Sequence, residues 1–284
     1  MDKPILMMYT SRIAPEGSCP QRFDRQPFAE GKVHSVQIRG GAVKEKIAEV
    51  PWRMTVGEIL DLCGARVEDT KALYMGWPTG CFYPADPGRE LELNCETLYV
   101  VDRTECAAAL LGQLAEHVRN CSCGRCVFGR EGTYQLHLFF TDILARKGRS
   151  TDLERLDELC RAMVSQSACS AGVAAGSSFL SALSLFREEL EAHILKKTCP
   201  ALVCKAYVNY YIDPALCSGC GECVSVCDED AIEGKKGLIH ILDTDLCEKC
   251  GQCLSECPVG AVKAASGSMP KLPSRPIARG LWKG

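Results

Sequence analysis

The stretch that decides the fold of this chain is a cysteine run that occurs twice, as CSGCGECVSVC at residues 217–227 and as CEKCGQCLSEC at residues 247–257. In each run the cysteines are separated by two, two and three residues, and the second run begins 30 residues after the first. The flanking residues repeat as well, because Asp213 corresponds to Asp243. We therefore interpret the two runs as copies of one ligand-binding loop.

The spacing within each run is typical of a cubane iron–sulfur cluster. A tight loop can direct three thiolates to three corners of the cubane, and the fourth cysteine of each run binds the other cluster. We therefore predict two [4Fe–4S] clusters. The predicted ligands are Cys217, Cys220, Cys223 and Cys257 for cluster 1, and Cys247, Cys250, Cys253 and Cys227 for cluster 2. Structural zinc sites also use Cys-x2-Cys pairs, but they do not explain a doubled run of four cysteines.

Residues 206–264 resemble the bacterial two-cluster ferredoxin module. Pro258 follows the second run as the pattern of that family expects, whereas Asp228 replaces proline after the first run. This replacement leaves the ligands intact and places a negative charge near a cluster. The resemblance implies a C-terminal bacterial ferredoxin-type domain over residues 205–265.

Composition narrows the class of protein. Twenty cysteines in 284 residues are well above the usage of an ordinary globular protein, which indicates either disulfide bonds or metal binding. The N-terminal residues contain no apolar run long enough for a signal peptide, and no stretch is apolar enough over the length of a membrane span, so we expect a cytoplasmic protein with reduced thiols available to metal. The net charge of −3 offers no basic surface for nucleic acid.

The pattern of apolar and polar residues in the remaining sequence predicts an α+β protein. Capping boxes at Thr55–Glu58 and Thr151–Glu154 each predict a helix start, and Gly64 can close the first of these helices. Apolar spacing predicts one helix over 178–196. The expected organisation is an extended N-terminal arm (1–32), a β-grasp-like domain (33–103), a helical bundle (104–204), the ferredoxin-type domain (205–265) and a C-terminal tail (266–284).

Two motifs outside the cysteine repeat carry a second resemblance. SCGRCVFGREG at residues 122–132 resembles the S-C-G-x-C-x-x-C-R-E-G motif of the NADH-oxidising flavoprotein subunit of complex I and of electron-bifurcating hydrogenases. GWPTGCFYP at residues 76–84 resembles the glycine-rich loop of the SLBB β-grasp domain in that family. The similarity covers about residues 33–264, the C-terminal part of that subunit, and implies an iron–sulfur cluster in the helical domain.

Gly129 is the main departure from this family, because it stands where the third cysteine of the motif is expected. Three interpretations remain open. Cys121 replaces the missing thiolate, so that Cys121, Cys123, Cys126 and Cys169 hold a third cluster; or three thiolates hold a cluster with an open or non-cysteine ligand; or the region has lost its metal and keeps only the fold.

A zinc site is predicted between the last helix and the ferredoxin-type domain. His193, Cys199 and Cys204 are close in sequence, and Cys106 is the best candidate for a fourth ligand. Cysteines that flank the cluster domain in the bifurcating-hydrogenase branch of the family support this prediction. The alternative is a solvated histidine at a helix end with buried free thiols. We assign no chemistry to Cys19, Cys63, Cys81, Cys95 and Cys160, and expect Cys63 and Cys160 in the core.

The resemblance also indicates what to expect of function. The flavin domain that binds FMN and NADH in full-length relatives is not recognisable here, and no phosphate-binding glycine motif or catalytic pair stands out. We therefore expect a non-catalytic electron-transfer subunit that relays electrons between the flavin of a partner flavoprotein and a catalytic subunit of an oxidoreductase complex. Two rival interpretations are an NAD(P)H dehydrogenase subunit that binds its own flavin, and a free-standing polyferredoxin shuttle.

Overall fold

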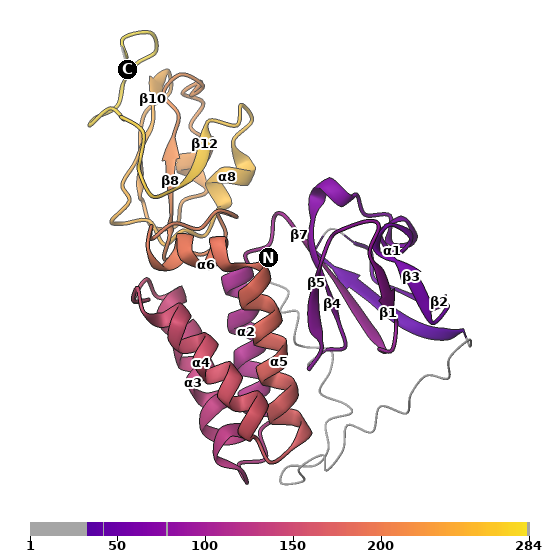
Figure 1. Cartoon of the computed structure of the whole chain (residues 1–284). Helices are drawn as coiled ribbons and strands as arrows, with labels where there is room; N and C mark the ends of the chain where they lie inside the picture. Colours follow the sequence, from indigo (N-terminus) through magenta and orange to yellow (C-terminus); the bar gives the residue numbers. More distant parts are fainter. Residues whose placement is uncertain (1–32, 42, 78, 283–284) are drawn as a thin grey trace. The chain divides into compact units, whose positions relative to one another are not determined.

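The computed structural model describes residues 33–41, 43–77 and 79–282 (Figure 1). It is an α+β protein, as expected, and divides into two compact units, residues 1–195 and residues 196–284. The arm predicted for residues 1–32 lies outside the described residues. Among those described, no helix is both long enough and apolar enough to cross a membrane.

The first unit begins with a mixed five-stranded sheet in the order β2-β1-β7-β4-β5. Strands β1 and β7 pair in parallel, and the other neighbours pair antiparallel. The strands of this sheet are β1 (His34–Gly40), β2 (Lys46–Val50), β4 (Thr70–Met75), β5 (Cys81–Pro84) and β7 (Thr97–Asp102). A short ladder of β3 (Arg53–Thr55) and β6 (Glu90–Glu92) and the 3-10 turn η1 (Val67–Asp69) complete this part.

Helix α1 (Val56–Cys63) begins and ends as the sequence predicts. The Thr55 side chain accepts the N–H of Glu58, and the Glu58 carboxylate accepts the N–H of Thr55 at 2.8 Å. Gly64, at φ 70°, closes the helix in the left-handed region that favours glycine. The buried face of α1 packs on Val36 and Ile38 of β1.

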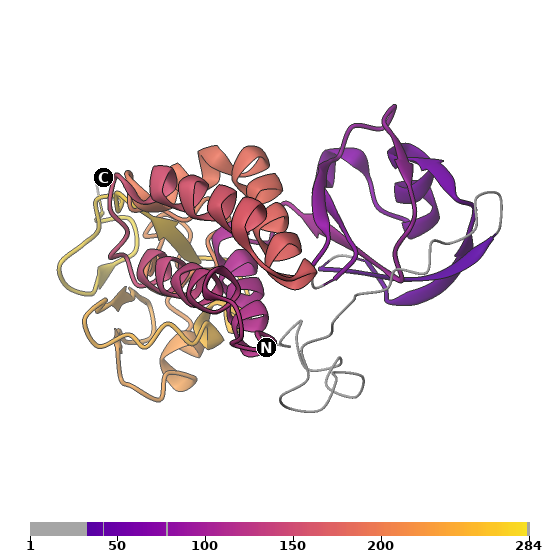
Figure 2. The same ribbon diagram turned by 60° about the horizontal axis from the view of Figure 1, so that its bottom comes forward.

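Helices α2 to α5 run side by side after the sheet (Figures 1 and 2), and α6 follows them. They are α2 (Ala107–Asn120), α3 (Val127–Leu144), α4 (Asp152–Gln166), α5 (Ser170–Leu185) and α6 (Arg187–Ile194). The predicted single helix over 178–196 is wrong in two ways: the chain becomes helical at Ser170, and it is interrupted at Phe186, where φ is −105° and ψ is 18°.

The helix start predicted at Thr151 is confirmed, because α4 begins at Asp152, but the capping box predicted there is wrong. Thr151 has φ −85° and ψ −5°, and its side chain caps nothing, because a capping residue needs extended backbone to aim its oxygen at the first turn. Asp152 instead accepts the backbone N–H of Arg149 at 2.7 Å, and its side chain is buried.

Buried polar contacts join the sheet and the helices within the first unit. The Tyr74 hydroxyl lies 3.0 Å from Ser178 Oγ, and both residues are buried. Lys71 Nζ lies 2.8 Å from the Glu189 carboxylate, and these side chains are only 14% and 13% exposed. The other carboxylate oxygen of Glu189 accepts the first N–H of α2, from Ala107, at 2.8 Å. Glu189 therefore ties α6 to both a strand and a helix terminus.

Among the described residues, the second unit contains three antiparallel ladders and two short helices. β8 (Val208–Ile212) pairs with β12 (Val262–Ser266), and β9 (Ile232–Glu233) pairs with β11 (Ile241–Leu242). The helices are α7 (Glu222–Ser225) and α8 (Gln252–Glu256). β13 (Ile277–Ala278) pairs with β10 (Leu238–Ile239), and Ile277 and Trp282 pack on the core. This part of the predicted tail is therefore integrated into the unit.

Candidate iron–sulfur and metal centres

The two ferredoxin-type loops have the same local geometry. Asp213 Oδ1 accepts the N–H of Ala215, and Asp243 Oδ1 accepts the N–H of Asp245, so each loop is preceded by the same turn. Gly221 and Gly251 then adopt φ of 96° and 82° immediately before α7 and α8. A left-handed residue is needed here to reverse the chain tightly enough for consecutive cysteines to face one centre.

The fourth cysteine of each run lies with the other run. Burial raises the pKa of Cys223 to about 11, and the thiols of Cys217, Cys220 and Cys257 add to the effect, with a smaller contribution from Cys253. Burial likewise raises the pKa of Cys253 to about 11, with contributions from Cys247, Cys250 and Cys227. These are the two crossed sets that the spacing predicts.

The second crossed set surrounds a small hollow. Cys227, Cys247, Cys250 and Cys253 all line a cavity of about 70 Å³. Tyr210 closes one side of it, and these cysteine thiols raise the pKa of the Tyr210 hydroxyl, after burial as the main cause. Asp228, Glu229 and Glu248 lie on its rim. Four thiols that line one hollow are a fitting ligand set for a cubane.

Backbone N–H groups and one histidine ring lie close to the sulfur atoms. The backbone N–H of Ala261 donates to Cys257 Sγ at 3.2 Å, and the backbone N–H of Lys249 donates to Cys247 Sγ at 3.4 Å. Burial opposes ionisation of Cys257, but nearby backbone N–H groups outweigh it and lower the pKa of this thiol. His240 lies against Cys217, with its backbone N–H 3.5 Å and its Nδ1 3.7 Å from that Sγ.

In the helical domain the structure brings two of the four predicted ligands together. Cys126 and Cys169 are the N-cap residues of α3 and α5, and their Sγ atoms are 4.0 Å apart. The N-terminus of a helix favours negative charge, so both positions suit thiolates. A Cβ added at Gly129 would lie 2.6 Å from Cys126 Sγ and 3.8 Å from Cys169 Sγ. The missing third thiolate would therefore have faced this pair.

Cys121 has a different neighbour. It is the C-cap residue of α2, and its Sγ lies 3.5 Å from Nε2 of His117, one turn earlier on the same helix. Burial raises the pKa of Cys121 and lowers that of His117. Sequence reasoning missed His117, although its spacing of four residues from Cys121 on a helix places both side chains on one face.

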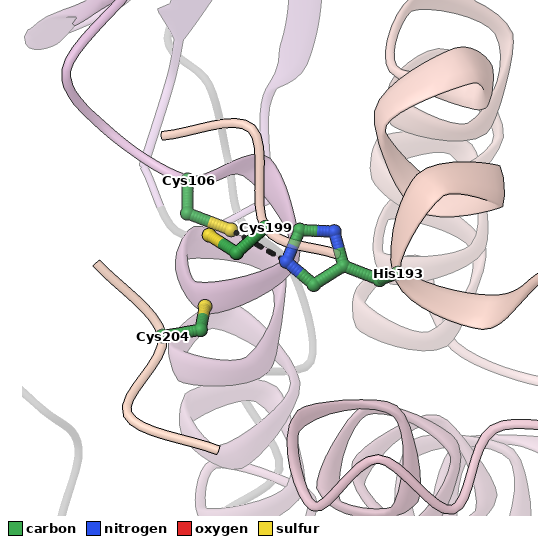
Figure 3. A group of neighbouring side chains, drawn as sticks. All are labelled: Cys106, His193, Cys199 and Cys204. Carbon is green, nitrogen blue, oxygen red and sulfur yellow. Dashed lines mark hydrogen bonds between the residues drawn. The ribbon is translucent and has the colours of Figure 1, made fainter. Parts of the chain in front are cut away.

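The four predicted zinc ligands form one group. The Sγ atoms of Cys106, Cys199 and Cys204 and a ring nitrogen of His193 all lie within 4.8 Å of one another, and all four residues are buried (Figure 3). Cys106 Sγ is 3.3 Å from His193 Nε2. Nδ1 of His193 lies 2.8 Å from the carbonyl oxygen of Glu189. That carbonyl can only accept, so the proton is on Nδ1 and the Nε2 lone pair faces the thiols.

Two of the cysteines without assigned chemistry, Cys63 and Cys160, lie in the core. Cys160 is fully buried in α4, and burial, aided by Asp157, raises its pKa to about 12. Cys63 belongs to the core beneath the sheet, and burial raises its pKa to about 11. Both core predictions are confirmed. Cys19 lies outside the described residues.

Comparison with known families identifies two iron–sulfur domains in the chain. The NADH-ubiquinone oxidoreductase-F iron-sulfur binding region matches residues 109–193, and the 4Fe-4S dicluster domain matches residues 216–261. The first match contains Cys121, Cys123, Cys126 and Cys169, and the second contains both cysteine runs.

Individual relatives agree with these domains. HndC, a subunit of the NADP-reducing hydrogenase of Solidesulfovibrio fructosivorans, is 31% identical over 209 residues, which are 68% of this chain and 42% of that protein. A subunit of the NADH-quinone oxidoreductase of Streptomyces coelicolor is 31% identical over 166 residues, 54% of this chain and 37% of that protein. A crystal structure of an NAD+-reducing [NiFe]-hydrogenase in the H2-reduced state matches with a TM-score of 0.53 and 27% identity, over 57% of this chain and 29% of that chain. The chain spans less than half the length of these relatives.

Proposed function

We propose that this chain is the iron–sulfur relay subunit of a cytoplasmic multi-subunit oxidoreductase. It passes electrons between the flavin of a partner flavoprotein, which we infer to be NAD(P)H-linked from the names of its relatives, and a catalytic subunit. The observation that carries the proposal is the crossed arrangement of the two cysteine runs, because each fourth thiol lies with the other run. Two clusters that share ligand loops in this way are close enough to exchange electrons.

The ferredoxin-type unit holds two [4Fe–4S] clusters in this proposal. Cluster 1 is bound by Cys217, Cys220, Cys223 and Cys257, and cluster 2 by Cys247, Cys250, Cys253 and Cys227. The cavity along the second set supports a centre there, and the N–H donors to Cys247 and Cys257 support an anionic centre at each position. When bound, each cluster accepts and releases one electron, and the chain contributes the thiolates and the hydrogen bonds to them.

The helical domain holds a third cluster in this proposal, with Cys121, Cys123, Cys126 and Cys169 as ligands. The proximity of Cys126 and Cys169 at two helix N-termini supports it. Cys121 must leave His117 to join them. We assign the sheet over residues 33–103 to an SLBB-like β-grasp domain, because its first and last strands pair in parallel at the centre of the sheet.

The buried group of three thiols and one imidazole fits a structural zinc ion. Zn–S bonds of about 2.3 Å and Zn–N bonds of about 2.0 Å in a tetrahedron place a sulfur and a nitrogen ligand about 3.5 Å apart. Cys106 and His193 already lie 3.3 Å apart. The Glu189 carbonyl orients the imidazole from behind, as ligating histidines in metal sites require. Four protein ligands leave no open position, so the ion has a structural role.

Metal analysis of the anaerobically purified chain tests these assignments. About twelve irons and one zinc per chain support all three clusters and the zinc site, whereas about eight irons leave the helical domain without a cluster. Fewer than about eight irons would refute the crossed ligand sets.

The relay function needs a separate test. Dithionite should reduce the clusters of the isolated chain, whereas NADH and NADPH should not, because the flavin belongs to the partner. Adding the flavoprotein that co-purifies with the chain should restore reduction by NADH or NADPH. Reduction of the isolated chain by either nucleotide, with flavin bound, would show instead that the chain is a dehydrogenase subunit itself.

A further inference from the structure

The two proposed clusters have different neighbours at equivalent positions of the repeat. His240 stands seven residues before Cys247, and Tyr210 stands seven residues before Cys217. Each contacts the opposite ligand set, because His240 lies against Cys217 and Tyr210 lies along the hollow lined by Cys247. The backbone of the repeat is the same in both halves, but the side chains at these two equivalent positions differ in their hydrogen-bonding groups. His240 offers ring nitrogens, whereas Tyr210 offers a hydroxyl and no ring nitrogen.

The His240 ring is held in place. Its side chain is 1% exposed, and it lies directly over Gly234, where an added Cβ would come within 2.0 Å of Cδ2. Only glycine leaves room for the ring at this point. The backbone N–H of His240 is also directed at Cys217 Sγ, at 3.5 Å, which fixes the residue relative to that sulfur.

The surroundings decide which ring nitrogen carries the proton. Nδ1 lies 3.7 Å from Cys217 Sγ, whereas Nε2 is buried with no hydrogen-bond partner among the described residues. A proton on Nε2 would be a buried donor without an acceptor, at a cost of about 1–3 kcal/mol. A proton on Nδ1 points at a thiolate. The Nδ1–H tautomer is therefore favoured.

We infer that His240 donates its Nδ1–H to the Cys217 thiolate and thereby makes cluster 1 the preferred electron acceptor of the pair. The inference rests on the proposed assignment of the two clusters. Reduction adds one negative charge to a cluster, and a hydrogen bond to a ligand sulfur stabilises that charge, which raises the potential. Cluster 2 has Tyr210 at the equivalent position and the acidic residues Asp228, Glu229 and Glu248 on its rim, which oppose added negative charge.

The electron transfer balances without an external reactant. With both clusters bound, a single electron in the pair would leave cluster 2, which would return from the 1+ to the 2+ state, and would enter cluster 1, which would change from 2+ to 1+. No proton or bond is exchanged. At equilibrium, a single electron in this unit therefore resides mainly on cluster 1.

A redox titration of the full chain with dithionite, followed by electron paramagnetic resonance, tests the inference. The wild-type ferredoxin-type unit should show two unequal potentials. His240→Phe should lower the higher potential by about 59 mV, which is a tenfold change in the ratio of reduced to oxidised cluster for one electron. The lower potential should stay unchanged. His240→Asn keeps an N–H near the position of Nδ1 and should retain most of the difference. Tyr210→Phe is the matched control at the equivalent position of the other cluster and should leave the higher potential unchanged.

Two results would overturn the inference while the clusters remain. One is a His240→Phe variant with full iron content in which the higher potential is unchanged. The other needs no variant: in wild-type protein with 15N-labelled histidine, a His240 proton found on Nε2 instead of Nδ1 would exclude the donor. A wild-type chain with fewer than about eight irons would refute the cluster assignment itself, so the two failures are distinguishable.

Discussion

Replacing Gly129 by cysteine tests how the helical domain binds its cluster. The residue lies in the first turn of α3, directly beside the pair formed by Cys126 and Cys169. A Cβ at this position is 3.8 Å from Cys169 Sγ and 2.6 Å from Cys126 Sγ, so only the end of the Cys126 side chain must move to admit a new thiol. The added thiolate would then face the same centre as the other two.

The expected magnitude is a change of about four irons per chain, one cubane. If Cys121 supplies the fourth thiolate, Cys121→Ser should lower the iron content from about twelve to about eight. The double variant Gly129→Cys with Cys121→Ser should then restore about twelve, because position 129 takes over the missing corner. Iron analysis and the electron paramagnetic resonance spectrum of the reduced protein measure both changes.

Gly129→Ala is the matched control. It adds the Cβ and crowds Cys126 in the same way but brings no thiolate, so it should not restore iron in the Cys121→Ser background. Alanine has a helix propensity about 1 kcal/mol more favourable than that of glycine, and the added Cβ clashes only with the end of the Cys126 side chain, so the control should not unfold α3. Unchanged iron content in Cys121→Ser alone would refute the role of Cys121, and failure of Gly129→Cys to restore iron would refute the geometry deduced for position 129.

Three further predictions concern other parts of the chain. Cys204→Ser should lose the zinc while the iron content stays unchanged, and metal analysis that finds zinc retained would contradict the proposed ligand set. Asp228→Asn should raise the lower of the two ferredoxin potentials, by an energy of at most ~1 kcal/mol, which is the interaction of two unit charges 4 Å apart in water. Added salt should reduce this effect. If a redox titration shows that the higher potential changes instead, Asp228 lies near cluster 1 and not near cluster 2. Lys71→Met should lower the free energy of unfolding by about 3 kcal/mol, because it leaves the Glu189 carboxylate buried without the lysine ammonium. In denaturant unfolding, adding Glu189→Gln to this variant should recover part of the lost stability. No recovery would indicate that lost packing, and not an unpaired charge, is responsible.

The sequence alone determined the features that depend on neighbouring residues. The spacing of the cysteine runs predicted two ligand loops and their exchange of the fourth thiol, because a tight loop can serve only one centre with its first three cysteines. The capping box at Thr55 and the closing Gly64 defined α1, since both signals act within one or two turns. Sequence spacing also predicted that His193, Cys199 and Cys204 belong to one group. Cys106, the candidate for a fourth ligand from elsewhere in the chain, lies with them.

Tertiary structure decided what local patterns could not. The apolar spacing over 178–196 continues through Phe186, but the chain bends there, and α6 places Glu189 beside Lys71 and Ala107. His240 precedes the second cysteine run in sequence yet contacts Cys217 of the first, because the repeat folds so that each half covers the ligands of the other. No local signal reveals this contact, since the side chains that approach a sulfur are fixed by how strands far apart in the sequence pack together.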